Sequence, residues 1–288
     1  MIKKISYFFQ AVIIYLFFFI GKSLGLNLSK KIFAFVFNQV GPLFKSKSII
    51  EKNLKNFNIN LTDEQKENII SSMWKNYGIT FIEYIFLSAF KEKNDLVEVT
   101  RSDILKKISC NRPVIFVSGH FSNFELMSME ITKRKVKLAT IYRPLNNFFL
   151  NPFMVYLRKK YLCKKQVKKG LIGTRETINY IKNNNSIALM VDQRVGESER
   201  YPFFGVPAHT TTIPAQLALK YDLEIIPIFL ERKEENFFKM EIQQPIKYEK
   251  TLNSDEDKKN ITNEINRIIE KMILKNPTQW IWTHSRWK

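Results

Sequence analysis

The sequence places a histidine and a carboxylate, His120 and Glu125, in an arrangement suited to acid–base chemistry. A hydroxyl nucleophile is weak at neutral pH, and an imidazole, which titrates at about pH 6.5, can take its proton. A carboxylate on the other ring nitrogen fixes the tautomer and stabilises the imidazolium. Because the hydroxyl can belong to a substrate, no serine or cysteine of the protein is required. We therefore predict His120 as a general base and Glu125 as its orienting partner. Taken alone, the spacing also suits a histidine that packs in the core or caps a helix.

The pair follows directly on a predicted strand. Residues 113–119 read PVIFVSG, an apolar run typical of a buried strand. Functional residues of open α/β sheets gather where such strands end. The helix expected next would offer backbone N–H groups near Ser122 and Asn123 to an oxyanion, and we predict that Asn123 contacts substrate.

The remaining pattern alternates strands and helices. Apolar runs typical of buried strands recur at 136–142, 186–192 and 224–231. Helical patterns lie between them or flank them, at about 62–86, 122–134, 174–184, 213–221 and 255–275. Unbroken apolar strands between helices predict an α/β fold with a single sheet flanked by helices on both faces. Residues 237–243 alternate as in an edge strand.

Further polar residues follow the later strands. Arg143 suits a phosphate, because its guanidinium forks onto two oxygens, although a surface ion pair is the alternative. Asp192 could hold an arginine or a substrate, or cap the following turn. Thr211 could contact substrate or cap the helix at 213–221. We predict a substrate-binding set of Asn123, Arg143, Asp192, Gln193, Arg194, His209 and Thr211. We expect no metal site, because the three histidines are far apart and lack a paired ligand motif.

The charge points to anionic partners. The chain has 46 Lys and Arg against 27 Asp and Glu, a formal net charge of +19. Such a field attracts nucleic acid, anionic lipid or an acidic protein, unless the composition is simply rich in lysine throughout. No helix-turn-helix, zinc-finger or RNP signature is present, so we expect no nucleic acid. Cys110 and Cys163 lack metal or redox spacing and are expected to be reduced thiols.

The N-terminus predicts a membrane anchor. Residues 5–20 are apolar except at Gln10 and lie between lysines. The length of this run is slightly below the roughly 20 residues of a spanning helix. A second apolar stretch, 31–44, is expected to lie on the membrane surface and to end at Pro42. A buried core helix of a soluble protein is the alternative. We predict an anchor and interfacial segment at 1–45 and a catalytic domain at 46–288, on the cytoplasmic face because Lys and Arg are in excess downstream.

Several motifs resemble one family. GHFSNFE at 119–125 resembles the HX4D/E block of the glycerolipid acyltransferase superfamily, and more closely that of the bacterial lipid A biosynthesis lauroyl/myristoyl acyltransferases. Thr278 stands where that family usually has Glu, and Ser285 stands in its usual Arg-Arg pair. The blocks that match in the same order are IYRPLNN at 141–147, DQRVG at 192–196, PFFGVPAHTTT at 202–212, IIPIFLER at 225–232 and PTQWIWTHSRWK at 277–288.

This resemblance implies an acyltransferase without a cofactor. The donor would be an acyl-carrier-protein thioester and the acceptor a hydroxyl of a lipid A precursor. The partners would be acyl carrier protein and inner-membrane phospholipids, at the cytoplasmic face of the cell inner membrane. Two alternatives stay open: acylation of a glycolipid, an ornithine lipid or a lysophospholipid, and a catalytically silent membrane-lipid-binding protein.

Overall fold

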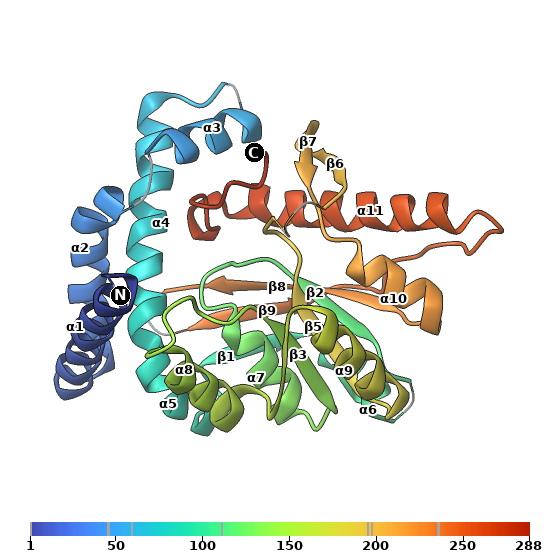
Figure 1. Cartoon of the computed structure of the whole chain (residues 1–288), viewed down its shortest axis with the longest axis horizontal. Coiled ribbons are helices and arrows are strands. Elements are labelled where there is room, and N and C mark those ends of the chain that lie inside the picture. The colour runs from blue at the N-terminus through green and yellow to red at the C-terminus, as the bar shows by residue number, and fades with distance from the viewer. Residues whose placement is uncertain are drawn as a thin grey trace.

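The computed structural model describes residues 2–44, 47–58, 60–110, 112–194, 196, 198–234 and 237–288 (Figure 1). The helices are α1 (Ile2–Leu24), α2 (Leu26–Phe44), α3 (Lys47–Phe57), α4 (Asp63–Glu83), α5 (Leu87–Glu92), α6 (Ser102–Cys110), α7 (Glu125–Lys133), α8 (Asn151–Leu157), α9 (Leu171–Lys182), α10 (Ile213–Tyr221) and α11 (Ser254–Lys275). Short helical turns are η1 (Tyr84–Phe86), η2 (Arg158–Leu162, a π turn) and η3 (Pro277–Gln279).

A seven-stranded sheet forms the centre of the domain, in the order β1-β9-β8-β2-β5-β3-β4. Five neighbouring strands, β8 to β4 in that order, are parallel, whereas β9 is antiparallel to β8. The strands are β1 (Val97–Thr100), β2 (Ile115–Ser118), β3 (Leu138–Tyr142), β4 (Lys165–Lys168), β5 (Ser186–Met190), β8 (Ile225–Arg232) and β9 (Phe238–Ile242). A separate antiparallel hairpin consists of β6 (Arg200–Phe203) and β7 (Val206–His209).

Alternate side chains of the buried strands enter two apolar cores, one on each face of the sheet. In β2, Ile115 and Val117 join the core built with α10, α11 and the C-terminal tryptophans. Phe116 points the other way and joins the core built with α7, α8 and the first two helices. Figure 1 shows α11 and α7 on opposite sides of the sheet. The predicted α/β fold with one main sheet covered on both faces is confirmed.

Helix α4 connects the N-terminal helices to the rest of the protein. Thr62 begins it with a capping box, since its hydroxyl accepts from the Gln65 N–H and the Gln65 side chain accepts from the Thr62 N–H. Helix α2 packs along α4 so closely that a Cβ on Gly78 would lie 2.1 Å from the Phe33 carbonyl oxygen. Only glycine permits this backbone contact.

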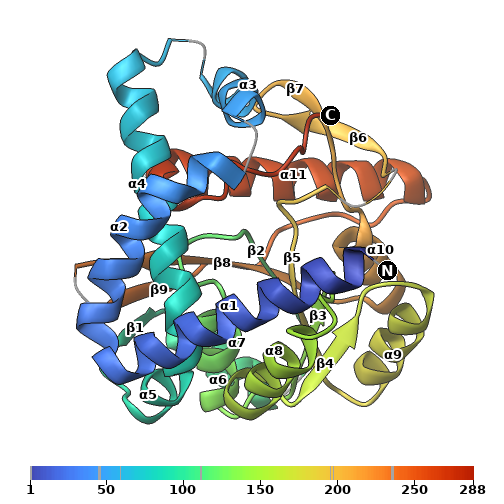
Figure 2. The ribbon, with the colours of Figure 1, turned by 60° about the vertical axis from the view of Figure 1, so that its left-hand side comes forward.

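Helix α1 is long and apolar enough to cross a membrane by length and composition. It does not project from the domain but lies along its surface, with Ala11, Phe18 and Gly21 buried against it (Figure 2). The opposite side of α1 is apolar and exposed, including Phe9 and Phe19. The predicted apolar N-terminal helix is confirmed, whereas the domain boundary at residue 45 stays a prediction.

Three details of the sequence interpretation differ from the structure. Strand β9 is not at the edge, because β1 pairs with its outer side. Pro42 lies inside the last turn of α2 rather than ending it. Strands β1, β4 and the β6–β7 hairpin were not predicted, since each has four residues and carries charged or proline residues that hide the apolar alternation.

We predict that Gly78→Ala destabilises the protein by about 1–3 kcal/mol, because the added methyl group must push the backbone of α2 away from α4. Urea unfolding in detergent would measure the loss. Lys75→Ala is the control, since this exposed residue lies one turn earlier on the same helix. Equal stability of the Gly78 and Lys75 variants would contradict tight α2–α4 packing.

Candidate active site

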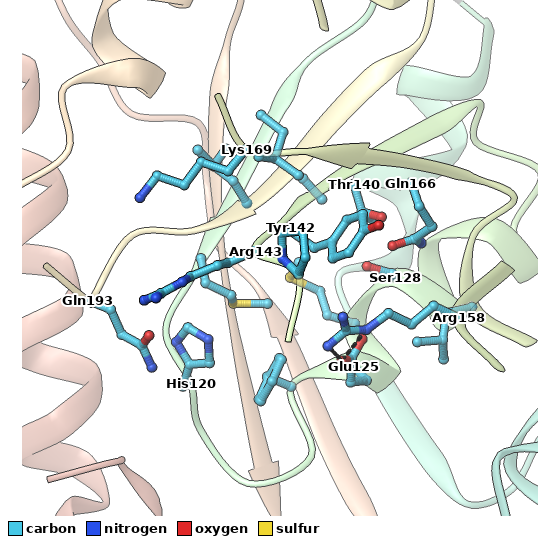
Figure 3. Close-up of a pocket in the computed structure, with 18 of the residues that line it drawn as sticks. His120, Glu125, Ser128, Thr140, Tyr142, Arg143, Arg158, Gln166, Lys169 and Gln193 are labelled. Atoms are coloured by element: carbon cyan, nitrogen blue, oxygen red, sulfur yellow. Dashed lines mark hydrogen bonds and ion pairs between the residues drawn. The ribbon is translucent and has the colours of Figure 1, made fainter. Parts of the chain in front are cut away.

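A cavity of about 520 Å³ opens at the carboxyl ends of the parallel strands (Figure 3). It lies where the connections diverge: β2 continues through α7 to β3 on one side, whereas β5 leads through α10 to β8 on the other. Such switch points are the usual binding crevices of parallel sheets. Six of the predicted site residues line it: His120, Glu125, Arg143, Gln193, Arg194 and Thr211.

The carboxylate bonded to His120 is Asp192, at the end of the neighbouring strand β5. Nδ1 of His120 lies 2.7 Å from Asp192 Oδ1, and the His120 backbone N–H donates to Oδ2 at 2.8 Å. No hydrogen bond joins His120 to Glu125 within the described ranges. The orienting role expected of Glu125 therefore falls to Asp192, which reaches His120 because β2 and β5 are adjacent in the sheet.

Asp192 is buried but remains ionised. Burial alone would raise the pKa of its carboxyl. The adjacent His120 ring and the hydrogen bonds from His120 and from Trp280 Nε1, 2.8 Å from Oδ2, outweigh burial and lower that pKa to about 2. An ionised Asp192 can only accept a hydrogen bond, so the proton of the neutral His120 ring lies on Nδ1. In this tautomer the free lone pair of His120 is on Nε2.

The His120 ring is held with one nitrogen available for chemistry. The Phe124 ring packs edge-to-face on it, with centroids 4.5 Å apart. Nε2 has no hydrogen-bond partner in the part of the chain that the structure describes. A neutral imidazole fixed in this way can accept a proton from a hydroxyl brought into the cavity.

A strained turn separates the histidine from α7. Ser122 adopts φ +42°, in the left-handed region. Its N–H donates to the Gln279 carbonyl at 3.0 Å, and its hydroxyl donates to the Leu230 carbonyl. The Ser122 N–H is therefore occupied and does not serve as the oxyanion donor that the sequence suggested.

Glu125 forms a second buried cluster across the cavity from His120 (Figure 3). Its Oε1 accepts from Arg158 Nε at 2.8 Å, from Arg158 Nη2 at 2.5 Å and from the Tyr84 hydroxyl at 2.6 Å. Burial and then the Glu125 charge raise the pKa of Tyr84. Burial alone would lower the pKa of Arg158, but the Glu125 charge, Tyr84 and the hydrogen bonds to both together outweigh it and raise that pKa. Arg158 was not predicted, because its basic neighbours Lys159 and Lys160 conceal it in the sequence.

Two other predicted residues lie away from the cavity. Asn123 is buried, and its amide donates to Glu83 Oε2 at 3.0 Å, so it supports the loop from behind instead of contacting substrate. His209 lies in β7 with Nδ1 2.9 Å from the Ser198 carbonyl oxygen, which makes it structural. Thr211 does line the cavity, and its hydroxyl accepts from the Ile213 N–H at 3.4 Å.

The cavity is rich in cations. Arg143 and Lys169 line it without forming an ion pair to any described residue, whereas the Arg194 side chain donates to the Gly196 carbonyl. Burial and then the charge of Arg143 lower the pKa of Lys169. Two neighbouring cations that no described acidic side chain neutralises provide a site for an anionic group.

The C-terminal segment contacts Asp192 through buried side chains. Arg286 is fully buried, donates to the Asp192 carbonyl at 3.1 Å and stacks 3.6 Å from the Phe203 ring centroid. Burial outweighs the Asp192 and Glu270 charges and lowers the pKa of Arg286 to about 10. Trp280, Trp282 and Trp287 are buried, so they pack the core and do not lie at a membrane interface.

No three His, Cys, Asp or Glu side chains gather as a metal-ligand set among the described residues. Cys163 is a buried free thiol, while the side chain of Cys110 lies outside the part described.

Comparison with known proteins assigns the chain to a family. Residues 2–288 match the family described as bacterial lipid A biosynthesis acyltransferase. The chain belongs to this family. The match spans both the N-terminal helices and the cavity, as the motif resemblance implied.

Individual acyltransferases of this family are distant in sequence. The chain is 24% identical over 280 residues to the lipid A biosynthesis palmitoleoyltransferase of Escherichia coli K12, covering 92% of this chain and 88% of that protein. A lipid A biosynthesis acyltransferase of Haemophilus influenzae is 23% identical over 263 residues, or 89% and 82% of the two chains.

We predict a pH-dependent stability cost for Asp192→Asn. Because the Asp192 pKa is lowered from 3.8 to about 2, its ionised form stabilises the fold above about pH 4, and this contribution is lost as the pH falls towards 2. The variant should be less stable by on the order of 2 kcal/mol near neutral pH, and the difference should shrink on acidification. Chemical unfolding at several pH values, with the exposed Glu224→Gln as control, would measure it. A difference that stays constant with pH would contradict the lowered pKa.

We also predict strong coupling between Glu125 and Arg158. Arg158→Leu leaves a buried carboxylate without its cation, which should cost about 3–5 kcal/mol, and adding Glu125→Gln should recover part of that loss. A double-mutant cycle of unfolding free energies measures this coupling. The exposed pair Glu264–Arg267 is the control, with an expected coupling of about 0–1 kcal/mol. Similar coupling in both pairs would contradict a buried Glu125–Arg158 pair.

Proposed function

We propose that the protein transfers a fatty acyl chain from an acyl-carrier-protein thioester to a hydroxyl of a lipid A precursor. The observation that supports it most directly is the His120–Asp192 pair, in which no described residue bonds Nε2, in a member of the lipid A biosynthesis acyltransferase family.

In this mechanism His120 acts as the base. Nε2 takes the proton of the acceptor hydroxyl as its oxygen bonds to the thioester carbonyl carbon, and Asp192 stabilises the imidazolium that forms. The C–S bond then breaks, and the imidazolium returns the proton to the departing thiolate. The products are an ester and the free thiol of the carrier, and His120 is neutral again.

Arg143 and Lys169 would bind the anionic group of a substrate. The donor's phosphopantetheine and the acceptor's phosphates both carry such groups, and an arginine fork suits phosphate. Gln193 lies on the same side of the cavity as His120 (Figure 3), and Gln193 and Arg194 would contact the acceptor headgroup. The Glu125–Arg158 pair lies opposite and would shape the other wall.

Membrane attachment through α1 would bring this cavity to its lipid acceptor. The apolar outer side of α1 suits the bilayer, and the net charge of +19 suits anionic lipid and an acidic carrier protein. We assign the protein to the cytoplasmic face of the inner membrane.

Acyl transfer in isolated membranes tests the proposal. Several acyl-carrier-protein thioesters and a Kdo-bearing lipid A precursor would be supplied, and mass spectrometry would identify the product. We expect one added acyl mass, reduced about 10²–10⁴-fold in His120→Ala and also strongly reduced in Asp192→Asn. His209→Gln is the matched histidine control and should retain turnover.

The possible outcomes test separately the mechanism, the identity of the acceptor and the reaction itself. Full activity in His120→Ala would contradict the mechanism. Transfer to a glycolipid, an ornithine lipid or a lysophospholipid instead would change the acceptor, and no transfer to any lipid would favour a silent lipid-binding protein.

A further inference from the structure

An exposed aliphatic pair lies at the start of α9, two and three residues after Lys169. Leu171 is 88% exposed and Ile172 77% exposed. Single exposed apolar residues are common on protein surfaces, but an adjacent pair of this exposure needs a reason.

The fold holds this pair outward. Helix α9 begins so close to β4 that a Cβ on Gly173 would lie 1.7 Å from the Lys168 carbonyl oxygen. The Thr174 N–H and hydroxyl both bond the Gly170 carbonyl, at 2.9 and 3.1 Å, which closes the first turn. Leu171 and Ile172 are therefore presented on a fixed turn.

Basic residues flank the pair along the chain. Residues 164–176 contain five Lys or Arg and one acidic residue. Lys164, Lys168 and Arg175 are exposed. We call Leu171 and Ile172 the α9 tip. An exposed aliphatic tip next to basic residues is complementary to a bilayer that contains anionic lipid, because the aliphatic side chains can enter the acyl boundary while the lysines contact the headgroups.

The exposed pair comes shortly after a cavity-lining residue in the sequence. Lys169 lines the cavity (Figure 3), and Leu171 follows two residues later in the chain. Two other cavity-lining residues, Leu145 and Asn146, lead into a loop that packs on α1: the Asn147 amide donates to the Tyr7 carbonyl at 2.8 Å, and the Phe149 carbonyl accepts from the Tyr15 hydroxyl at 3.0 Å. Figure 2 shows the beginning of α1 and the β4–α9 connection on the same side of the domain.

We propose that Leu171 and Ile172, with Lys164 and Lys168, form a second membrane contact at the rim of the cavity, apart from α1. The protein then rests on the bilayer at two places, and the cavity opens towards the lipid surface between them. This inference rests on the proposed function only in that the acceptor is a membrane lipid.

Site-specific fluorescence tests the contact without measuring turnover. Leu171→Cys would be made in the full chain with Cys110 and Cys163 replaced by serine, labelled with an environment-sensitive dye and mixed with phosphatidylethanolamine–phosphatidylglycerol vesicles. We expect a blue shift and quenching by spin-labelled lipid. Phe9→Cys on α1 reports membrane attachment, and Leu252→Cys, a fully exposed leucine elsewhere, is the matched control that should not respond.

A second variant tests the consequence for the reaction. Leu171→Ser/Ile172→Ser should raise the KM for a vesicle-embedded acceptor roughly tenfold, equivalent to about 1.4 kcal/mol, with little change in kcat or in the KM for detergent-dispersed acceptor. Lys164→Gln/Lys168→Gln should reduce the response of the Leu171→Cys label to phosphatidylglycerol.

The failures are distinguishable. A label at position 171 that stays unshifted while position 9 responds would overturn the second contact and leave the proposed function intact. Shielding of the position 171 label by acyl carrier protein but not by vesicles would also overturn it and assign the tip to an acidic protein. A blue shift in a protein that transfers no acyl chain would support the contact and oppose the proposed function.

Discussion

The arrangement of the site depends on one buried carboxylate, that of Asp192. A lone buried charge would be costly, and here three donors from two distant segments offset that cost: two groups of His120 and the indole N–H of Trp280. Arg286 adds a bond to the Asp192 carbonyl from within the core. The ends of β2 and β5 and the C-terminal segment are thereby fixed to one another. A histidine held by so many bonds keeps one tautomer without rearranging during a reaction, which is the condition for efficient proton transfer.

The two carboxylates of the site have separate tasks because of where the chain turns. Glu125 follows His120 closely in sequence, but the left-handed Ser122 redirects the backbone, and α7 then aims Glu125 at Arg158 and Tyr84. Asp192 is 72 residues away in sequence and yet directly beside the histidine, because β5 is the neighbour of β2. A short motif therefore identifies the location of the chemistry without identifying the partner of its histidine.

This distinction explains how far the sequence could lead. The strand before His120 was predictable because it is a continuous apolar run. Strand ends meet at one edge of the sheet, and Arg143, Gln193 and Arg194 line the same cavity as His120. The strand order was not predictable from local patterns, so Asp192 was assigned to substrate instead of to His120. The polar groups of Asn123 and His209 are buried in the folded chain and form hydrogen bonds within the protein. No sequence pattern indicates that burial.

The N-terminal helices and the loop that carries His120 are joined through a second buried acid, Glu83 of α4. Lys30 of α2 lies 3.2 Å from its Oε1, Arg232 of β8 pairs with both oxygens, and Asn123 donates to Oε2. Because Glu83 is fully buried, moving any one of these partners would leave its charge less well compensated. The position of α2 and the conformation of the His120 loop are therefore linked. The proposed contact of the first helices with a lipid surface would therefore reach the His120 loop through Lys30, Glu83 and Asn123.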